Sequence, residues 1–154
     1  MSAWYRKVVD NIANIIECIE HFEDEYAASR KELTIKGKPL EKHSSELPGI
    51  FEHRFSQLQE IEAILEHLNI LLRKKRSETF KKYFEHYQRQ LSARECEKYV
   101  DSEPDVVDLT HLVNEFALLR NKYLSMIKGL DAKSFQINNI VKLRVAGLED
   151  AEVQ

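Results

Sequence analysis

The sequence predicts an all-α protein, an elongated helical bundle with heptad-patterned seams that we expect to be oligomeric. Only four glycines and three prolines occur in 154 residues, and a protein built from β-sheets needs more turn-forming residues than that. Charged residues make up 32% of the chain, as expected for long amphipathic helices with solvated outer faces. Apolar residues recur at steps of three and four through most of the sequence, which is the helical period.

The first predicted helix runs from about Ala3 to Leu33 and forms an N-terminal helical arm over residues 1–35. Its apolar residues follow the heptad spacing with which two helices pack side by side. Residues 36–49 contain two glycines and two prolines, so this segment is predicted to be a connector. The residues of the first seam are Val8, Ile12, Ile15, Ile19, Phe22 and Tyr26.

A main helical domain is predicted over residues 50–148, and it begins with a long helix from about Ile50 to Leu91. Ser92 and Glu95 then have the spacing of a capping box, which predicts the start of a short new helix. The apolar stripe of the long helix continues as aromatic residues near its end. It consists of Phe51, Phe55, Leu58, Ile61, Leu65, Leu68, Leu72, Phe80, Tyr83 and Tyr87.

The acidic segment 101–105 predicts a break, and its Pro104 suits the first turn of the next helix. That helix is expected to stop at Gly129, and a last helix is expected from Asp131 to Gly147. Residues 149–154 form an acidic tail. The third seam consists of Val106, Leu109, Val113, Phe116, Tyr123, Ile127 and Leu130, with Arg120 interrupting it.

Exposed apolar seams are unstable alone, so they must pair within the chain or between chains. One interpretation is an intramolecular bundle in which every seam is satisfied. The other is a homo-oligomer that uses the first and last seams, whose lengths do not fix a subunit number. The residues predicted for oligomerisation are Val8, Ile12, Ile15, Ile19, Phe22, Phe135, Ile137, Ile140 and Val141.

Charge is distributed unevenly along the chain. Eight Lys and Arg residues stand against two Glu between Arg73 and Arg94, a local charge of +6, so the rest of a chain of −3 carries −9. Such asymmetry favours a localised anion-binding surface. The predicted nucleic-acid-binding residues are Arg73, Lys74, Lys75, Arg76, Lys81, Lys82 and Arg89.

A helical projection places Lys74, Lys75, Lys81, Lys82 and Arg89 on one face, where a row of cations can follow a phosphate backbone. Most rings of this helix fall on the opposite, core side, and Phe84 lies at the margin. The alternative is a solvated lysine face without a ligand. Arg76 lies within the apolar stripe, where an arginine requires a carboxylate or a phosphate partner.

The histidines, cysteines and glutamates of the sequence do not have the spacing of a catalytic or metal-binding site. None of the six histidines follows a glutamate by three residues, as the Glu-x-x-His motif of di-iron bundles requires. Cys18 and His21 lack a second pair of ligands. We therefore expect no enzyme, no catalytic residue, no cofactor and no metal. Two distant cysteines, no signal-peptide core and no membrane span predict a cytoplasmic protein.

The region from Leu47 to Gly147 resembles the recombination mediator family of tailed phages, the UvsY type. A Lys/Arg-rich helix ending in tyrosines precedes an acidic break, a helix, a turn into a last helix and a final Ala-Gly. The sequence departs from that pattern after Tyr87, where a glycine turn is common, and at Ser134, where glycine is common. The N-terminal arm has no counterpart. The residues that carry the resemblance are Leu72–Arg76, Tyr83, Tyr87, Glu103–Leu109, Lys128–Leu130, Ser134–Ile140 and Ala146–Gly147.

The resemblance implies a small oligomer that binds single-stranded DNA without catalysing a reaction. Members of the family help to load a RecA-like recombinase onto DNA coated with single-strand-binding protein, and these would be the partners. The sequence alone does not distinguish DNA from RNA. The alternative function is a helical protein–protein adaptor or a virion component that does not bind nucleic acid.

Overall fold

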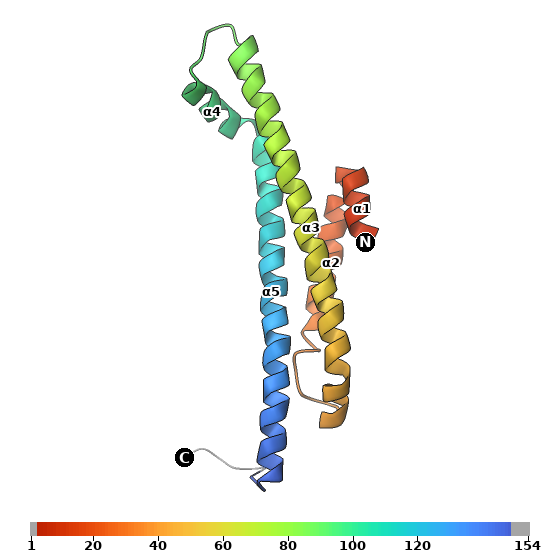
Figure 1. The fold of residues 1–154 in the computed structure, drawn as a ribbon. Helices are drawn as coiled ribbons and strands as arrows, with labels where there is room; N and C mark the ends of the chain where they lie inside the picture. Colours follow the sequence, from red (N-terminus) through yellow and green to blue (C-terminus); the bar gives the residue numbers. More distant parts are fainter. Residues whose placement is uncertain (1–2, 149–154) are drawn as a thin grey trace. The chain divides into compact units, whose positions relative to one another are not determined.

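A computed structural model describes residues 3–148, and the predicted acidic tail at 149–154 lies outside this range. Every regular element in the described range is a helix, which confirms the all-α prediction (Figure 1). None of the described helices combines the length and the apolarity needed to cross a membrane. The elements are α1 (Ala3–Asp10), the 3-10 helix η1 (Ile12–Asn14), α2 (Ile15–Ser29), α3 (Leu40–His86), α4 (Ala93–Ser102) and α5 (Pro104–Val145).

The prediction of one helix from Ala3 to Leu33 is wrong, because the helix breaks at Asn11. The backbone of Asn11 is extended, with φ −151° and ψ 114°, and its side chain accepts a hydrogen bond from the Ala13 N–H. A short amide side chain competes in this way with the helical hydrogen bonds and caps a new helix. The apolar periodicity passes through the break, so the spacing alone did not reveal it.

The predicted connector at 36–49 is also misplaced, since α3 begins at Leu40 and contains Pro48 and Gly49. Pro48 removes one helical hydrogen bond and normally ends or kinks a helix. Here the turn before it buries Leu47, and that burial favours the helical path. At its other end α3 stops at His86 rather than at Leu91.

Two predicted helix starts are confirmed and one predicted stop is wrong. Ser92 and Glu95 form a capping box at the start of α4, and α5 begins at Pro104. However, α5 continues through Gly129 to Val145. A Cβ atom added to Gly129 would lie 2.9 Å from Cδ2 of Leu33, so this glycine allows a close approach instead of ending a helix.

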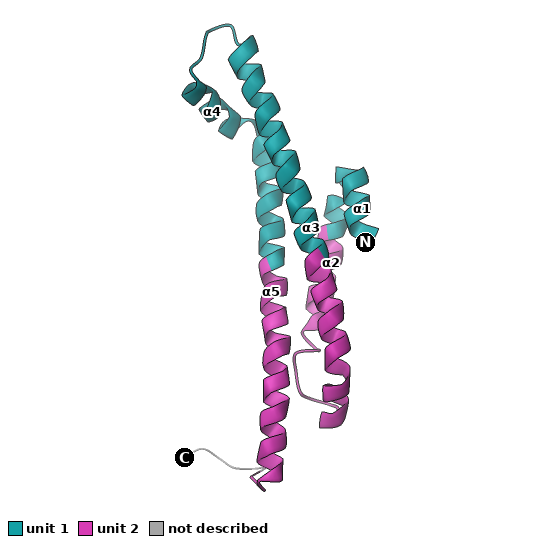
Figure 2. Cartoon of the chain, in the orientation of Figure 1, with its two compact units in different colours: residues 1–18, 60–120 teal, residues 19–59, 121–154 magenta. Residues whose placement is uncertain are grey.

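The chain divides into two compact units, and α2, α3 and α5 each contribute residues to both (Figure 2). Unit 1 comprises Met1–Cys18 and Glu60–Arg120. In it the Tyr5 backbone N–H donates to Oε1 of Glu60 over 3.0 Å, which joins α1 to α3. The buried apolar residues of unit 1 are Val8, Ile15, Cys18, Ile61, Ile64, Leu65, Leu68, Leu91, Cys96, Val100, Val106, Phe116 and Leu119.

Unit 2 comprises Ile19–Gln59 and Asn121–Gln154. Within it α2 is attached to α5 twice: the Tyr123 hydroxyl donates to the Phe22 carbonyl over 3.0 Å, and Lys122 pairs with Glu23 at 2.7 Å. The rings of Phe22 and Tyr123 also meet edge to face. The buried apolar residues of unit 2 are Phe22, Leu47, Leu58, Tyr123, Met126, Leu130 and Ile137.

Four of the nine residues predicted for oligomerisation are core residues of the single chain. Val8, Ile15, Phe22 and Ile137 are each at most 5% exposed, so they have no surface to offer a second copy. Five of the nine, Ile12, Ile19, Phe135, Ile140 and Val141, are half-buried or exposed. Oligomerisation itself stays a prediction.

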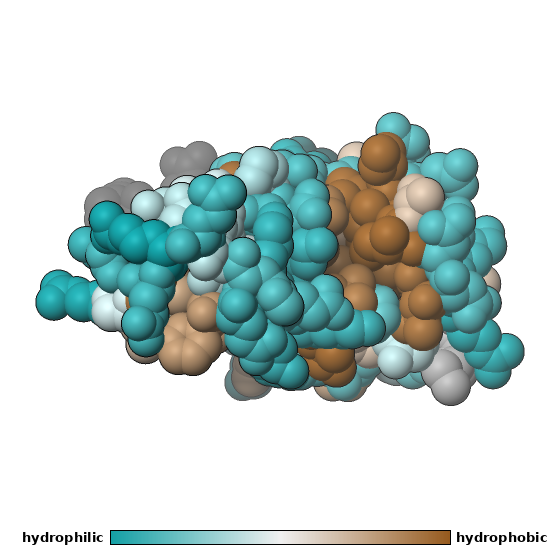
Figure 3. All heavy atoms as spheres, turned by 90° about the horizontal axis from the view of Figure 1, so that it is seen from above, coloured by the Kyte–Doolittle hydropathy of each residue, from teal (hydrophilic) through white to brown (hydrophobic). Residues whose placement is uncertain are grey.

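Apolar side chains also appear on the surface. Figure 3 shows them gathered over one part of the face seen from above, while hydrophilic side chains cover most of the rest. In unit 1 the exposed large apolar residues include Ile16, at 65% exposure, and Ile70, at 48%.

Candidate nucleic-acid interface

The predicted basic segment lies in unit 1, where the end of α3 meets α4 and the first turn of α5. The apolar stripe that runs along α3 through Ile64 and Leu68 is buried, and beyond it the stripe is interrupted by Arg76. Acidic residues from the break at 101–105 face this part of α3. The chain thus brings its most basic helix segment against one of its most acidic short segments.

Three of the predicted DNA-binding cations form ion pairs with that acidic break. Lys75 Nζ lies 3.0 Å from Asp105 Oδ2, and Arg76 Nη1 lies 2.8 Å from Asp101 Oδ1. Lys82 Nζ lies 3.8 Å from an oxygen of Glu103. The prediction that Arg76 requires an anionic partner is confirmed, and the partner is a carboxylate of the same chain.

Two further cations are paired outside the break. Arg73 Nη2 lies 3.0 Å from Oε1 of Glu66, which is about two turns earlier in α3. Arg89 lies beyond the end of α3, so the prediction that it shares a helical face with the lysines is wrong. Its Nη2 is 3.2 Å from Oε1 of Glu95, the glutamate of the capping box.

Lys74 and Lys81 remain without a carboxylate partner among the residues that the structure describes. Both are exposed. Of the seven cations that the sequence predicts for a polyanion, these two are therefore the ones that can contact phosphate without first breaking an ion pair.

The aromatic residues of this region form two groups, Phe80 with Phe84 and Tyr83 with Tyr87 and Tyr99, which we together call the ring cluster. Phe80 and Phe84 stack with ring centroids 5.6 Å apart and an interplanar angle of 14°. Tyr83 stacks on Tyr99 at 5.3 Å. Rings from α3 and α4 thereby present several flat surfaces at one end of unit 1.

Of the three rings expected on the core side, Phe80 and Tyr83 are half-buried, but the expectation is wrong for Tyr87, which is 47% exposed. The physical reason is that α3 ends at His86, so Tyr87 lies beyond the helix. Phe84, expected at the margin, is 54% exposed, and Tyr99 of α4 is 41% exposed. These rings retain faces that are open to solvent.

Glu103 connects the cations to the ring cluster. The Tyr83 hydroxyl donates to one of its carboxylate oxygens over 2.7 Å, and this hydrogen bond raises the pKa of Tyr83. Lys82, the ion-pair partner of Glu103, also lies 5.5 Å from the centroid of the Tyr83 ring, within the range of a cation–π interaction. Beside these residues Tyr87, Arg89, Leu91 and Tyr99 border a hollow of about 350 Å³.

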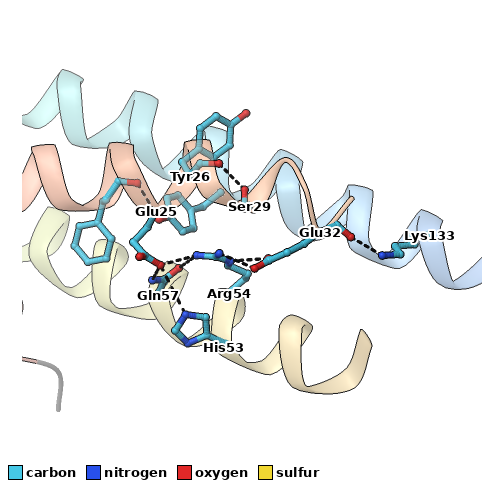
Figure 4. Close-up of polar contacts among 10 residues, drawn as sticks. Glu25, Tyr26, Ser29, Glu32, His53, Arg54, Gln57 and Lys133 are labelled. Carbon is cyan, nitrogen blue, oxygen red and sulfur yellow. Dashed lines mark hydrogen bonds and ion pairs between the residues drawn. The ribbon is translucent and has the colours of Figure 1, made fainter. Parts of the chain in front are cut away.

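A second charged cluster, in unit 2, was not predicted from the sequence. Arg54 is only 4% exposed, and its guanidinium lies between two carboxylates (Figure 4). Nη1 lies 2.7 Å from Glu25, and Nε and Nη2 bind the two oxygens of Glu32 at 2.9 and 2.8 Å. The Gln57 amide donates to Glu25 and accepts from Arg54. Figure 4 also shows Lys133 reaching the Glu32 backbone.

The electrostatics of this cluster follow from its contacts. The hydrogen bond from Gln57, together with Arg54, lowers the pKa of Glu25. Carboxylate hydrogen bonds raise the pKa of Arg54. The sequence did contain an indication that these two cations are buried. Arg54 lies four residues before the buried Leu58, and Lys133 lies four residues before the buried Ile137, so each cation shares a helical face with core residues.

Within residues 3–148, no group of three or more His, Cys, Asp or Glu side chains is arranged to hold a metal ion. Cys18 and Cys96 are buried free thiols. Comparison with protein-family models, curated proteins and solved structures finds no match for this chain.

Proposed function

We propose that this chain is a non-catalytic protein that binds single-stranded DNA through the ring cluster and the lysines beside it, and that it acts as a recombination mediator. The observation that carries the proposal is the exposure of Phe84, Tyr87 and Tyr99 next to Lys81 and Lys82. Proteins that bind single strands combine aromatic faces, on which bases stack, with cations that follow the backbone.

The ring cluster supplies the stacking part of that requirement. Base–aromatic stacking contributes roughly 1–3 kcal/mol per base, and the half-exposed rings lie on two helices, so more than one base can be accommodated. The cations supply less than the sequence suggested, since five of the seven are paired with carboxylates. Stacking should therefore contribute more of the affinity than phosphate contacts do.

The test is fluorescence anisotropy with a labelled oligothymidylate at low salt. The double variant Phe84→Ala/Tyr87→Ala should bind about tenfold or more weakly than wild type. The control is Phe55→Ala, which removes a ring of comparable exposure (44%) from unit 2 and should leave the affinity unchanged. If wild-type protein does not change the anisotropy of the oligonucleotide at low salt, the proposal is wrong.

The salt dependence separates the two sources of affinity. Seven phosphate contacts would give a slope of log K against log salt near −5, whereas two would give about −1.4, at roughly −0.7 per contact for single strands. We expect the shallower slope, and the variant Lys74→Ala/Lys81→Ala should reduce it further. The mediator role itself is tested by recombinase loading: the protein should accelerate assembly of a RecA-like recombinase on DNA coated with single-strand-binding protein.

A helical protein–protein adaptor or virion component is the second candidate. The observation that favours it is the neutralisation of the basic segment by the chain's own acids, which leaves Lys74 and Lys81 as cations without such partners in the described range. In that case the protein forms oligomers in solution, and adding oligonucleotide changes neither their size nor their stability.

A further inference from the structure

We propose that unit 2 contains a binding site for a small phosphorylated anion, in a cavity between the segment that follows α2, the start of α3 and Lys133 of α5. This site is separate from the ring cluster of unit 1, and its existence does not depend on DNA binding. The cavity has a volume of about 530 Å³, within the range of small-molecule sites. The basic residues that line it are Arg30, Lys31, Lys36, Lys38, Lys133 and His43.

Two carboxylates also line the cavity, and both are already engaged. Glu32 directs its two carboxylate oxygens to Arg54. Glu46 pairs with Lys38 at 2.6 Å and lies 3.9 Å from Lys42. Each of the two carboxylates thus already has a cation as its ion-pair partner.

Arg30, Lys31 and Lys36 have no carboxylate partner among the described residues, although Arg30 lies 5.9 Å from the ring of Tyr26. All three are exposed, come from one short segment and line the cavity. An anion that enters would meet several ammonium and guanidinium donors without displacing an existing ion pair.

Lys133 provides the first buried group of the site. The residue is 4% exposed, and its Nζ donates to the Glu32 carbonyl oxygen over 2.6 Å. A carbonyl satisfies one of the three ammonium donors but does not neutralise the charge. Burial, followed by the nearby Lys38, lowers the pKa of Lys133, and the carboxylates of Glu46 and Glu32 oppose this shift. A bound anion would also oppose it.

His43 provides the second buried group. It is 4% exposed, it lines the cavity, and its Nε2 has no hydrogen-bond partner among the described residues. A buried polar atom without a partner is destabilising, and a ligand oxygen in the cavity could serve as that partner. His43 also lies in the first turn of α3, where the helix dipole favours negative charge.

The chemistry favours a phosphoryl group over a carboxylate. Donors reach the cavity from three chain segments, and a phosphoryl group offers three acceptor oxygens and up to two negative charges to meet them. The volume exceeds that of one phosphate, which leaves room for a diphosphate. The described residues that line the cavity include no Phe, Tyr or Trp, so a nucleobase would find no such ring to stack on there.

The test is isothermal titration of the full chain with pyrophosphate, and with inorganic phosphate in parallel. We expect saturable binding at one site per chain, and pyrophosphate should bind more tightly than phosphate. The variant Lys31→Gln/Lys36→Gln removes two exposed charges without touching the core and should weaken pyrophosphate binding about tenfold or more. The control Lys98→Gln/Lys142→Gln makes the same charge change at exposed positions outside the cavity and should bind as wild type does.

Histidine NMR provides a second readout that does not depend on a variant folding. The imidazole signals of His43, assigned in the wild-type protein by correlation with its backbone resonances, should shift on addition of pyrophosphate, whereas those of the exposed His86 and His111 should not. No saturable heat up to about 10 mM pyrophosphate, a range that covers millimolar affinity, would overturn the proposal. Equal weakening in both lysine variants, or displacement of pyrophosphate by oligothymidylate from the same site, would also overturn it.

Discussion

Replacing Arg54 tests whether the charged cluster of unit 2 stabilises the fold. The variant Arg54→Met keeps most of the aliphatic length and removes the guanidinium. It leaves Glu25 and Glu32 without their cation, and it also removes a hydrogen bond to the buried Gln57. Breaking a buried ion pair by deleting one partner costs about 3–5 kcal/mol.

How deeply each partner is buried determines whether the loss of unfolding free energy lies near the lower or the upper end of that range. The Arg54 side chain is 4% exposed, but those of Glu25 and Glu32 are 33% and 26% exposed. Water can therefore solvate the two carboxylates after the arginine is gone. We expect a loss at the lower end, about 3 kcal/mol in the free energy of unfolding.

Urea unfolding followed by circular dichroism measures this loss. With a slope of about 2 kcal/mol per molar urea, the midpoint should fall by about 1.5 M. The matched control is Arg73→Met, which breaks an ion pair of 3.0 Å whose arginine is 67% exposed, and such surface pairs contribute at most about 1 kcal/mol. If Arg54→Met unfolds within about 0.5 kcal/mol of wild type, the cluster does not stabilise unit 2 and the reasoning from burial is wrong.

Three further predictions concern stability and reactivity. The Gln57 amide and Arg54 lower the pKa of Glu25 from its ordinary value of 4.5. The ionised Glu25 therefore contributes its full share to the free energy of unfolding above about pH 4.5, and this share is lost as the pH falls through the lowered pKa. The urea midpoint should consequently drop less on acidification in Glu25→Gln than in wild type. Gly49→Ala, with open space around it, should stabilise the helix by about 0.5–1 kcal/mol, whereas Gly129→Ala should stabilise it less because a leucine methyl must move. Burial, followed by the nearby charge of Glu60, raises the pKa of Cys18 to about 12, so a thiol reagent should label it only after unfolding.

The helices were predictable from the sequence because apolar spacing is a local property. The capping box at Ser92 and the start of α5 at Pro104 depend on residues within one turn, and both predictions are confirmed. The predicted stop at Gly129 is wrong for a reason that lies elsewhere in the chain, namely the approach of Leu33. Gly147, by contrast, has a φ of +69° and follows the end of α5.

The candidate interface was only partly predictable. Summing charge along the segment from Arg73 to Arg94 identified the cations, but such a sum ignores which acids approach them in space. Asp101 and Asp105 belong to a break that the sequence also revealed, yet nothing local indicates that the break faces α3. The exposure of Tyr87 was missed because a helical projection assigns a ring to the core face without showing where the helix ends.

Arg54 and Lys133 show what a charge at a seam position can mean. Each is buried in line with apolar residues, where a methionine would cover a similar apolar surface without desolvating a charge. Arg54 is compensated by two carboxylates. Lys133 donates only to a carbonyl oxygen and lines the same cavity as a histidine nitrogen that has no partner among the described residues. Arg54 forms direct ion pairs with two carboxylates, whereas Glu46 and Glu32 act on Lys133 without an ion pair, and its pKa is still lowered. An anion bound in the cavity could pair with Lys133 directly, which is the physical reason to look for one there.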